Sequence, residues 1–116
     1  MWCMATILAT RSRYGNCAPL RGGLITYHGA DIDLRLAGRR LFATHYPHYA
    51  RGLACTGDYD IVCCGHSHVA SVAQQPTING GMTWLLNPGS VAGLGGPATW
   101  LLADLVSFDF EIRRLD

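Results

Sequence analysis

Three short apolar runs in this chain each stop abruptly at polar residues, and this pattern constrains the fold more than any other feature. Residues 5–10, 41–44 and 61–64 are rich in aliphatic or β-branched side chains, which is typical of buried strands. They lead, in that order, to the segments YGNCA, ATHYPH and CCGHSH. Continuous apolar strands are typical of sheets covered on both faces. We therefore expect an α/β fold with polar groups gathered at the carboxyl ends of its strands.

Most of the remaining chain also has the pattern of strands. Ile32, Leu34 and Leu36 alternate with charged residues, which is the period of a half-exposed strand. Asn79-Gly80 is a strong hairpin signal between two further strands. The other expected elements are short strands and one weak helix: strands at 24–27, 69–73, 82–86, 99–105 and 108–113, and a helix within 47–57. The long segment LLNPGSVAGLGGPA reads as a glycine- and proline-rich loop.

Length, charge and cysteine content exclude several classes of protein. With 116 residues, the chain is expected to form one domain, residues 1–116. A net charge of +1, with no lysine, predicts no basic patch for nucleic acid and no attraction to an anionic membrane. The five cysteines include no CxxC pair, so neither a zinc ribbon nor a disulfide framework is indicated. We expect Cys63 and Cys64 to be reduced and buried, and the protein to be cytoplasmic.

The polar strand ends contain residues that bind transition metals. Imidazole nitrogen and amide oxygen are neutral ligands that suit manganese, iron, zinc or nickel. His66 and His68 are two positions apart, so both side chains can point to the same side of an extended segment. Taken singly, each has an ordinary alternative: a lone histidine is usually solvated, as we expect for His48, and Asn87-Pro88-Gly89 is in most proteins only a turn. Their joint occurrence at successive strand ends favours a metal site.

In this order, the segments GNC, THYPH, YDIVCCGHSH and LLNPGSV resemble the calcineurin-like metallophosphoesterase superfamily, and within it the small bacterial and archaeal phosphodiesterases. The resemblance extends from Arg13 to about Arg113. It implies a β-sandwich flanked by helices. Gly-His-x-His followed by Asn-Pro-Gly-Ser at this spacing is its specific signal, whereas Gly-Asn alone is not.

The resemblance also implies roles for individual residues. Asn16, His45 and His66 match ligands of the second metal, and His68 resembles a ligand of the first. Cys17 stands where other branches carry a histidine that protonates the leaving group, so Cys17 and His66 are the expected catalytic residues. The implied reaction is hydrolysis of a small phosphodiester by a hydroxide held between two divalent cations. Manganese is the first expectation, with zinc, iron, nickel or magnesium as alternatives.

The chain departs from this family pattern in its first part. The family begins with an Asp-x-His strand and a Gly-Asp loop, but the first fifteen residues here contain no aspartate or histidine. Ala18 and Tyr46 replace the usual aspartate and glycine, and Asp58 lies at a position where the family has no bridging ligand. The chain therefore resembles the carboxyl-terminal two-thirds of a phosphodiesterase: a fragment, a gene with a misplaced start, or a degenerate member.

Two functions follow from these departures. The first is a metal-dependent phosphodiesterase that is active when its amino-terminal portion is present. The alternative is a non-catalytic scaffold of the same fold, like the retromer subunit of this superfamily. Retention of four matching ligand positions favours the enzyme. In either case a sheet without its first strands exposes edges and apolar surface, so we expect a homo-oligomer or a partner chain to cover it.

Overall fold

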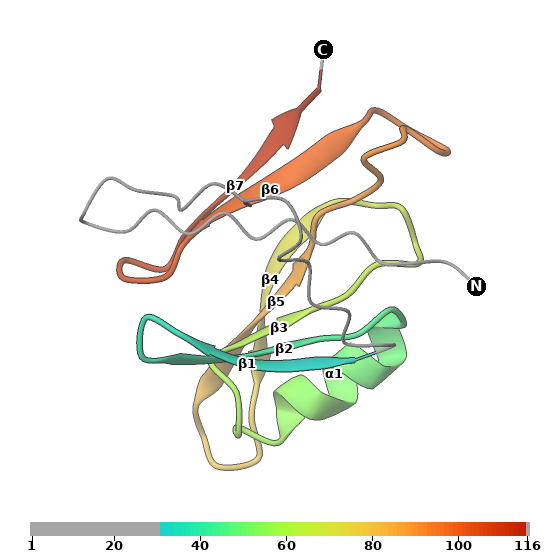
Figure 1. Ribbon diagram of the computed structural model, residues 1–116. Coiled ribbons are helices and arrows are strands. Elements are labelled where there is room, and N and C mark those ends of the chain that lie inside the picture. The colour runs from blue at the N-terminus through green and yellow to red at the C-terminus, as the bar shows by residue number, and fades with distance from the viewer. Residues whose placement is uncertain (1–30, 116) are drawn as a thin grey trace.

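The computed structural model of the protein describes residues 31–115, which form seven strands and one helix. The elements are, in chain order, β1 (Ile32–Leu36), β2 (Arg39–Ala43), α1 (Pro47–Cys55), β3 (Ile61–Cys63), β4 (Ser71–Pro76), β5 (Met82–Asn87), β6 (Thr99–Asp104) and β7 (Asp109–Arg114). They build a larger sheet with α1 on one side and a small second sheet on the other (Figure 1).

The larger sheet is mixed, with strand order β1-β2-β3-β5-β4. Its three central strands, β2, β3 and β5, pair in parallel, and the two outer strands are antiparallel to their neighbours. In the parallel register Ala43 pairs with Cys63, and Cys63 pairs with Leu86. The residues that follow these three positions therefore emerge along one edge of the sheet, as the sequence pattern predicts.

The side chains of β3 show how the sheet separates two apolar layers. Ile61 and Cys63 belong to the core between the sheet and the β6–β7 hairpin, together with Leu41, Leu86 and Leu101. The alternate residues of this segment face the helix, because successive side chains of a strand point to opposite faces. Val62 and Cys64 pack there with Ala50 and Ala54 of α1. A strand buried on both sides explains the continuous apolar run in the sequence.

The two neighbouring cysteines are buried, one in each layer, and neither forms a disulfide. Burial, with a smaller effect from the neighbouring Cys64, raises the pKa of the Cys63 thiol to about 12. Burial also raises the pKa of Cys64, although Arg51 opposes this. The prediction that both are buried free thiols is confirmed.

Helix α1 begins at a proline, as helices often do, because proline lacks only an N–H that would have no partner in the first turn. Its carboxyl end is closed by Thr56, whose N–H and hydroxyl both donate to the carbonyl of Leu53, at 3.2 and 2.7 Å. The buried Ala50 and Ala54 let the helix approach the sheet closely. The weak helix expected within 47–57 is therefore confirmed.

The fold class expected from the sequence is confirmed: a strand-rich α/β domain with two sheets and a flanking helix. Most strand bounds differ from expectation by one or two residues, and the strand expected at 69–73 begins later, at Ser71. The Val69 N–H there donates to the Ser67 hydroxyl instead of joining the sheet. The strands expected at 5–10 and 24–27 lie outside the described residues.

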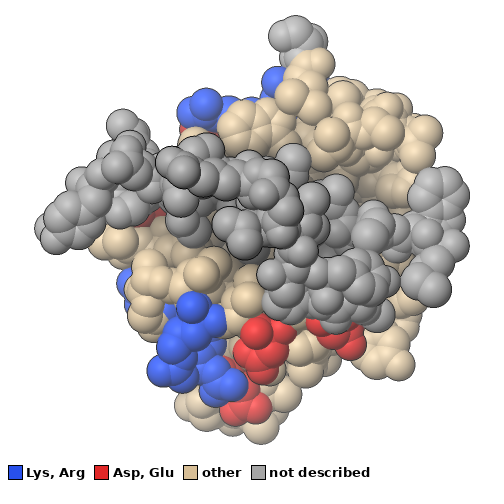
Figure 2. All heavy atoms as spheres, in the orientation of Figure 1, with Lys and Arg blue, Asp and Glu red and all other residues tan. Residues whose placement is uncertain are grey.

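The length of the helix and the charges on one face can be described for residues 31–115. No helix in this range is long and apolar enough to cross a bilayer. On the face shown in Figure 2, acidic and basic side chains lie next to one another, below the grey residues. Neighbouring charges of opposite sign do not build a field over the surface.

Candidate functional site

Two histidines from neighbouring parallel strands meet at the carboxyl edge of the larger sheet. His45 follows β2 and His66 follows β3, and His45 Nε2 lies 3.1 Å from His66 Nδ1. The pairing of the two strands continues into this region, because the Gly65 N–H donates to the His45 carbonyl at 3.0 Å. The backbone around His45 is thus fixed by the sheet, and one of the two imidazole nitrogens must carry the shared proton.

The loop after β3 holds two non-glycine residues in the left-handed region. The φ angles are +63° at His66 and +60° at His68. This conformation costs an L-residue about 1–2 kcal/mol and is adopted only where surrounding contacts impose it. Such strain is typical of functional sites, and here one of the two strained residues, His66, belongs to the histidine pair.

The buried carboxamide of Asn87, at the end of β5, supplies contacts that hold this loop. Its Nδ2 donates to the Gly65 carbonyl at 3.1 Å and to the Ser67 hydroxyl at 3.0 Å. Its Oδ1 accepts the Gly89 N–H at 3.0 Å. Asn87 is only 3% exposed, so water cannot readily replace these partners. The third parallel strand, β5, therefore also ends on a polar residue. Its side chain forms hydrogen bonds with the histidine loop, whereas His45 and His66 contact each other.

The turn after Asn87 joins the two sheets. The Thr99 hydroxyl, at the start of β6, donates to the Pro88 carbonyl at 2.8 Å. The Thr99 N–H donates to the Ser90 carbonyl at 3.0 Å. Gly89 has a φ of +82°, and a Cβ there would lie 2.1 Å from the Thr99 hydroxyl oxygen. Glycine is required at this position for both its conformation and its lack of a side chain.

Tyr46 packs against both histidines of the pair. Its ring centroid lies 4.9 Å from that of His45, nearly edge to face, and 4.9 Å from that of His66. The ring remains 44% exposed. A tyrosine where the family commonly has glycine therefore flanks the pair on one side and restricts the rotation of both imidazoles.

The second ring nitrogen of His45 has no partner among the described residues. His45 Nδ1 is buried and makes no hydrogen bond there, while Nε2 faces His66. A buried polar atom without a partner costs about 1–3 kcal/mol. The imidazole pair therefore has unmet bonding capacity within residues 31–115.

The two facing nitrogens are spaced as ligands of one cation would be. Two bonds of ~2.1 Å to a single ion place their nitrogens ~3.0 Å apart at a right angle and ~3.4 Å apart at a tetrahedral angle. The observed 3.1 Å lies between these values. Neutral imidazole nitrogens are also the ligand type that transition metals favour. The pair fits a divalent transition metal in both spacing and chemistry.

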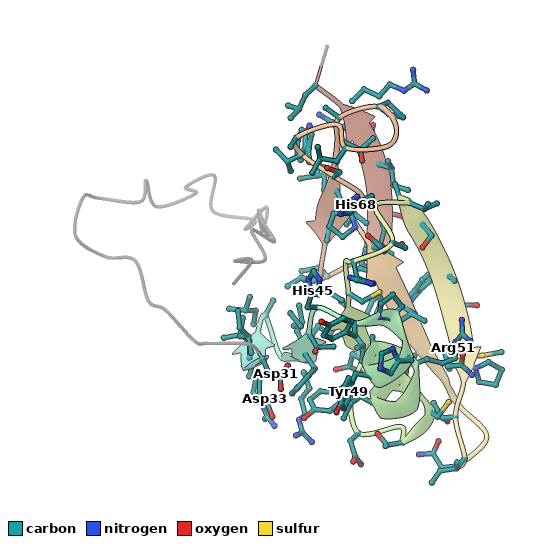
Figure 3. All side chains as sticks on the ribbon, turned by 90° about the vertical axis from the view of Figure 1, so that its right-hand side faces the viewer. Asp31, Asp33, His45, Tyr49, Arg51 and His68 are labelled. Carbon is teal, nitrogen blue, oxygen red and sulfur yellow. The ribbon has the colours of Figure 1, made fainter. Side chains whose placement is uncertain are left out.

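His68 is not brought into this contact. It is exposed, and in Figure 3 it lies above His45, toward the two-stranded sheet, while Asp31 and Asp33 of the β1 region lie below. Within residues 31–115 no three histidine, cysteine or acidic side chains come together as a metal-binding group. Asn16 and Cys17, the other predicted site residues, lie outside the described residues.

Sequence reasoning found the two histidines that meet but missed what holds them. The sequence pattern of Asn87-Pro88-Gly89 predicts an ordinary turn, without a contact for Asn87. The available signal was the apolar run of β5 ending on asparagine, as β2 and β3 end near histidine. Tyr46 was noted only as a departure from the family pattern.

The chain is similar to known proteins in family and in fold. The model of the calcineurin-like phosphoesterase superfamily domain matches residues 10–107. No curated protein sequence is significantly similar. A solved structure of an archaeal phosphodiesterase is similar in fold, with a TM-score of 0.64 at 22% sequence identity. The alignment covers 74% of this chain and 51% of the archaeal chain, so this protein spans about half the length of that relative.

The family match covers the sheet, the helix and the histidine loop, and members of this superfamily generally use divalent metals. The paired histidines at the carboxyl edge and the Asn-Pro-Gly-Ser turn lie within the matched residues. The chain belongs to the calcineurin-like phosphoesterase superfamily.

Proposed function

We propose that the protein contributes to the metal-dependent hydrolysis of phosphodiesters, and that His45 and His66 together hold one divalent cation. The observation that carries the proposal is the contact of these two imidazoles at the carboxyl ends of parallel strands, in a phosphoesterase-family domain. Open α/β sheets build their sites at this edge.

Manganese remains the first candidate for the metal, with zinc, iron, nickel or magnesium as alternatives. The described donors are two imidazole nitrogens, which suit the transition metals better than magnesium, whose preferred ligands are oxygens. Asn16 would add an amide oxygen to the same ion, and His68 would belong to a second one, as the family resemblance implies. A complete site of this kind takes two cations.

Each described residue has a distinct task in the proposed site. A bound divalent cation supplies Lewis-acid stabilisation of phosphoryl oxygens and makes water more acidic. His45 is half-buried and its backbone is held by the sheet, while His66 is exposed and faces the solvent from which a substrate arrives. Tyr46 limits the rotation of both rings. For Cys17 we propose the role of proton donor to the leaving group.

The test is hydrolysis of a chromogenic phosphodiester, bis(p-nitrophenyl) phosphate, in the presence of Mn²⁺. The protein is assayed as the 116-residue chain and as a chain extended at its amino end by a family segment with Asp-x-His and Gly-Asp. We expect metal-dependent turnover by the extended chain. His66→Ala removes one of the two imidazole ligands and should lower the turnover of the extended chain by at least about a hundredfold.

His48→Ala is the matched control, because His48 is an exposed histidine close to the pair that the proposal does not use. It should keep its activity within about twofold, as surface substitutions usually do. Equal activities of the His66→Ala and wild-type extended chains would contradict the proposal. Absence of both metal binding and turnover would favour the non-catalytic scaffold.

A further inference from the structure

We infer that Ser67 and Asn87 are positioning residues, a hydrogen-bonded clamp that fixes His66 and His68 in their left-handed conformations and aims His66 at His45. The inference deepens the proposed function, on which it rests for the nature of the bound cation. The clamp itself is a property of the chain and is present without metal.

The need for a clamp follows from the backbone. Both histidines flank Ser67, and both have φ near +60°. Neither position has the freedom of glycine, so each would relax toward the ordinary regions if the loop were released. Sheet bonding reaches only as far as Gly65, whose N–H donates to the His45 carbonyl, and β4 begins only at Ser71. The segment between them is therefore not held by the sheet.

His66 lies between two groups that are anchored to the same side chain. The carbonyl before it, on Gly65, and the hydroxyl after it, on Ser67, both accept hydrogen bonds from Asn87 Nδ2, at 3.1 and 3.0 Å. In addition, the Ser67 N–H donates to the Gly65 carbonyl at 2.7 Å. With both flanking groups fixed, the backbone of His66 has little room to turn.

His68 lies between two groups that are bonded to each other. The Ser67 hydroxyl accepts the N–H of Val69 at 3.3 Å, while it also accepts from Asn87. One oxygen thus connects both histidine positions to the buried asparagine. Ser67 is exposed, so its hydroxyl can be removed without opening the core.

The Asn87 side chain is itself held in place, because its oxygen also accepts a hydrogen bond. Asn87 Oδ1 accepts the Gly89 N–H at 3.0 Å, and the Gly89 turn is tied to β6 through Pro88 and Thr99. The buried carboxamide therefore connects the exposed histidine loop to β5 and, through the Gly89 turn, to β6. Supporting contacts of this kind usually change metal affinity 10–100-fold when they are removed.

The experiment measures Co²⁺ binding by its visible absorption, for the 116-residue wild type, Ser67→Ala and Ser67→Thr. We expect about tenfold weaker binding by Ser67→Ala, and affinity within about twofold of wild type for Ser67→Thr, which keeps the hydroxyl. The thermal midpoints of all three should be alike, because position 67 is exposed. Asn87→Ala should weaken binding further, with a lower thermal midpoint because the site is buried.

A second measurement needs no metal. Two-dimensional ¹H–¹⁵N spectra of the histidine rings report the tautomer of each imidazole in the metal-free protein. In the wild type and Ser67→Thr, we expect His45 and His66 to show one fixed tautomer each, because their nitrogens share a proton. In Ser67→Ala, the shifts of His66 should move toward the average of its two tautomers.

The outcomes separate this inference from the proposed function. If the wild type binds no Co²⁺, or His45→Ala binds it equally well, the proposed function fails, and the ring spectra alone decide the clamp. Ring spectra of Ser67→Ala identical to those of wild type would overturn the inference, whatever the metal binding. An equal loss of affinity in Ser67→Ala and Ser67→Thr would also overturn it, because the hydroxyl would then not be the cause.

Discussion

His45 Nε2 and His66 Nδ1 lie 3.1 Å apart, although 21 positions separate the two residues in the chain. The parallel pairing of β2 with β3 accounts for this closeness. Ala43 pairs with Cys63, and the Gly65 N–H then bonds to the His45 carbonyl, so each histidine leaves the sheet at nearly the same level. The sheet register fixes the backbone of this pair, whereas Ser67 and Asn87 fix the loop that carries His66.

Replacement of Gly89 by alanine should destabilise the domain by about 3 kcal/mol or more. The new Cβ would meet the Thr99 hydroxyl oxygen at 2.1 Å, and a φ of +82° costs a further ~1–2 kcal/mol. Urea unfolding measures the effect. Gly38→Ala is the matched control, because its φ is +74° but its Cβ would meet nothing within 4 Å, so about 1 kcal/mol is expected. Adding Thr99→Ala to Gly89→Ala should recover part of the loss, and strict additivity would argue against the clash.

Arg39 should be a strong contributor to the docking of the two sheets. Its Nε donates to the Leu105 carbonyl at 2.9 Å, its Nη2 to the Val106 carbonyl at 3.2 Å, and the guanidinium lies 3.9 Å from the centre of the Phe108 ring. We expect Arg39→Ala to lower the free energy of unfolding by about 2 kcal/mol.

Arg39→Lys should recover less than half of that loss, because lysine lacks the planar fork that reaches both carbonyls. Arg35→Ala is the control, on the exposed face of β1, with an expected change within about 0.5 kcal/mol. Equal stabilities of the alanine variants at 35 and 39 would show that the contacts with the β6–β7 hairpin contribute nothing.

The sequence was sufficient for the fold class because its strands are either continuously apolar or strictly alternating. Ile61 to Cys64 are buried without exception, and Ile32, Leu34 and Leu36 alternate with exposed residues. Which sheet each strand would join was harder to predict. Thr99 to Leu105 also alternate, yet pair with Asp109–Arg114 in a separate sheet, because pairing depends on long-range packing that periodicity does not contain.

The histidine pair was predictable for a similar reason, and the clamp was not. Strand ends that carry His45 and His66 are visible as polar residues after an apolar run. The left-handed φ of His66 and His68 has no clear sequence signal, because only a small minority of non-glycine residues adopt this region even though histidine is enriched there. The partner of the loop, Asn87, is 22 positions from Gly65, and a hydrogen bond between them depends on the β3–β5 register.

In the native protein, Cys63 and Cys64 should react with a bulky maleimide far more slowly than an unfolded thiol. Both are less than 5% exposed, and only the thiolate reacts, which burial disfavours at both positions. Mass mapping after timed labelling at pH 8 distinguishes the cysteines. Complete labelling in urea is the control, and half-buried Cys55 provides an internal comparison. Rapid native labelling of both residues would contradict their burial.

Cys63 should also make stability fall at high pH. Burial raises its pKa from 9.0 to about 12 in the folded protein. Between these values the unfolded chain loses the thiol proton while the folded chain keeps it, so unfolding is favoured as pH rises. The neutral Cys63 thiol therefore makes its full contribution to the free energy of unfolding below pH 9, and this contribution is lost as the pH rises toward 12.

This pH effect can be isolated with Cys63→Ala. The difference in unfolding free energy between wild type and variant should shrink by about 1.4 kcal/mol per pH unit across the middle of that range. Urea unfolding at several pH values, with reductant present, measures it. Because other titrating groups are common to both proteins, a pH-independent difference would mean that Cys63 ionises alike in the folded and unfolded chains.

The last prediction concerns how many metal ions the 116-residue chain binds. Residues 31–115 bring together two imidazoles but no group of three histidine, cysteine or acidic side chains, and the first fifteen residues contain no aspartate or histidine. Two unit charges ~4 Å apart repel by about 4 kcal/mol near a protein surface, and two dications by about four times as much. Neutral imidazoles do not offset that repulsion, whereas a bridging carboxylate does.

We therefore expect the chain to bind one Mn²⁺, Zn²⁺ or Ni²⁺ ion, with little phosphodiesterase turnover. Native mass spectrometry gives the stoichiometry, and calorimetric titration gives the affinity. His45→Ala and His66→Ala should each weaken binding at least about tenfold, while His48→Ala leaves it unchanged. A clear stoichiometry of two ions, together with robust turnover, would mean that a carboxylate from elsewhere in the chain bridges the metals.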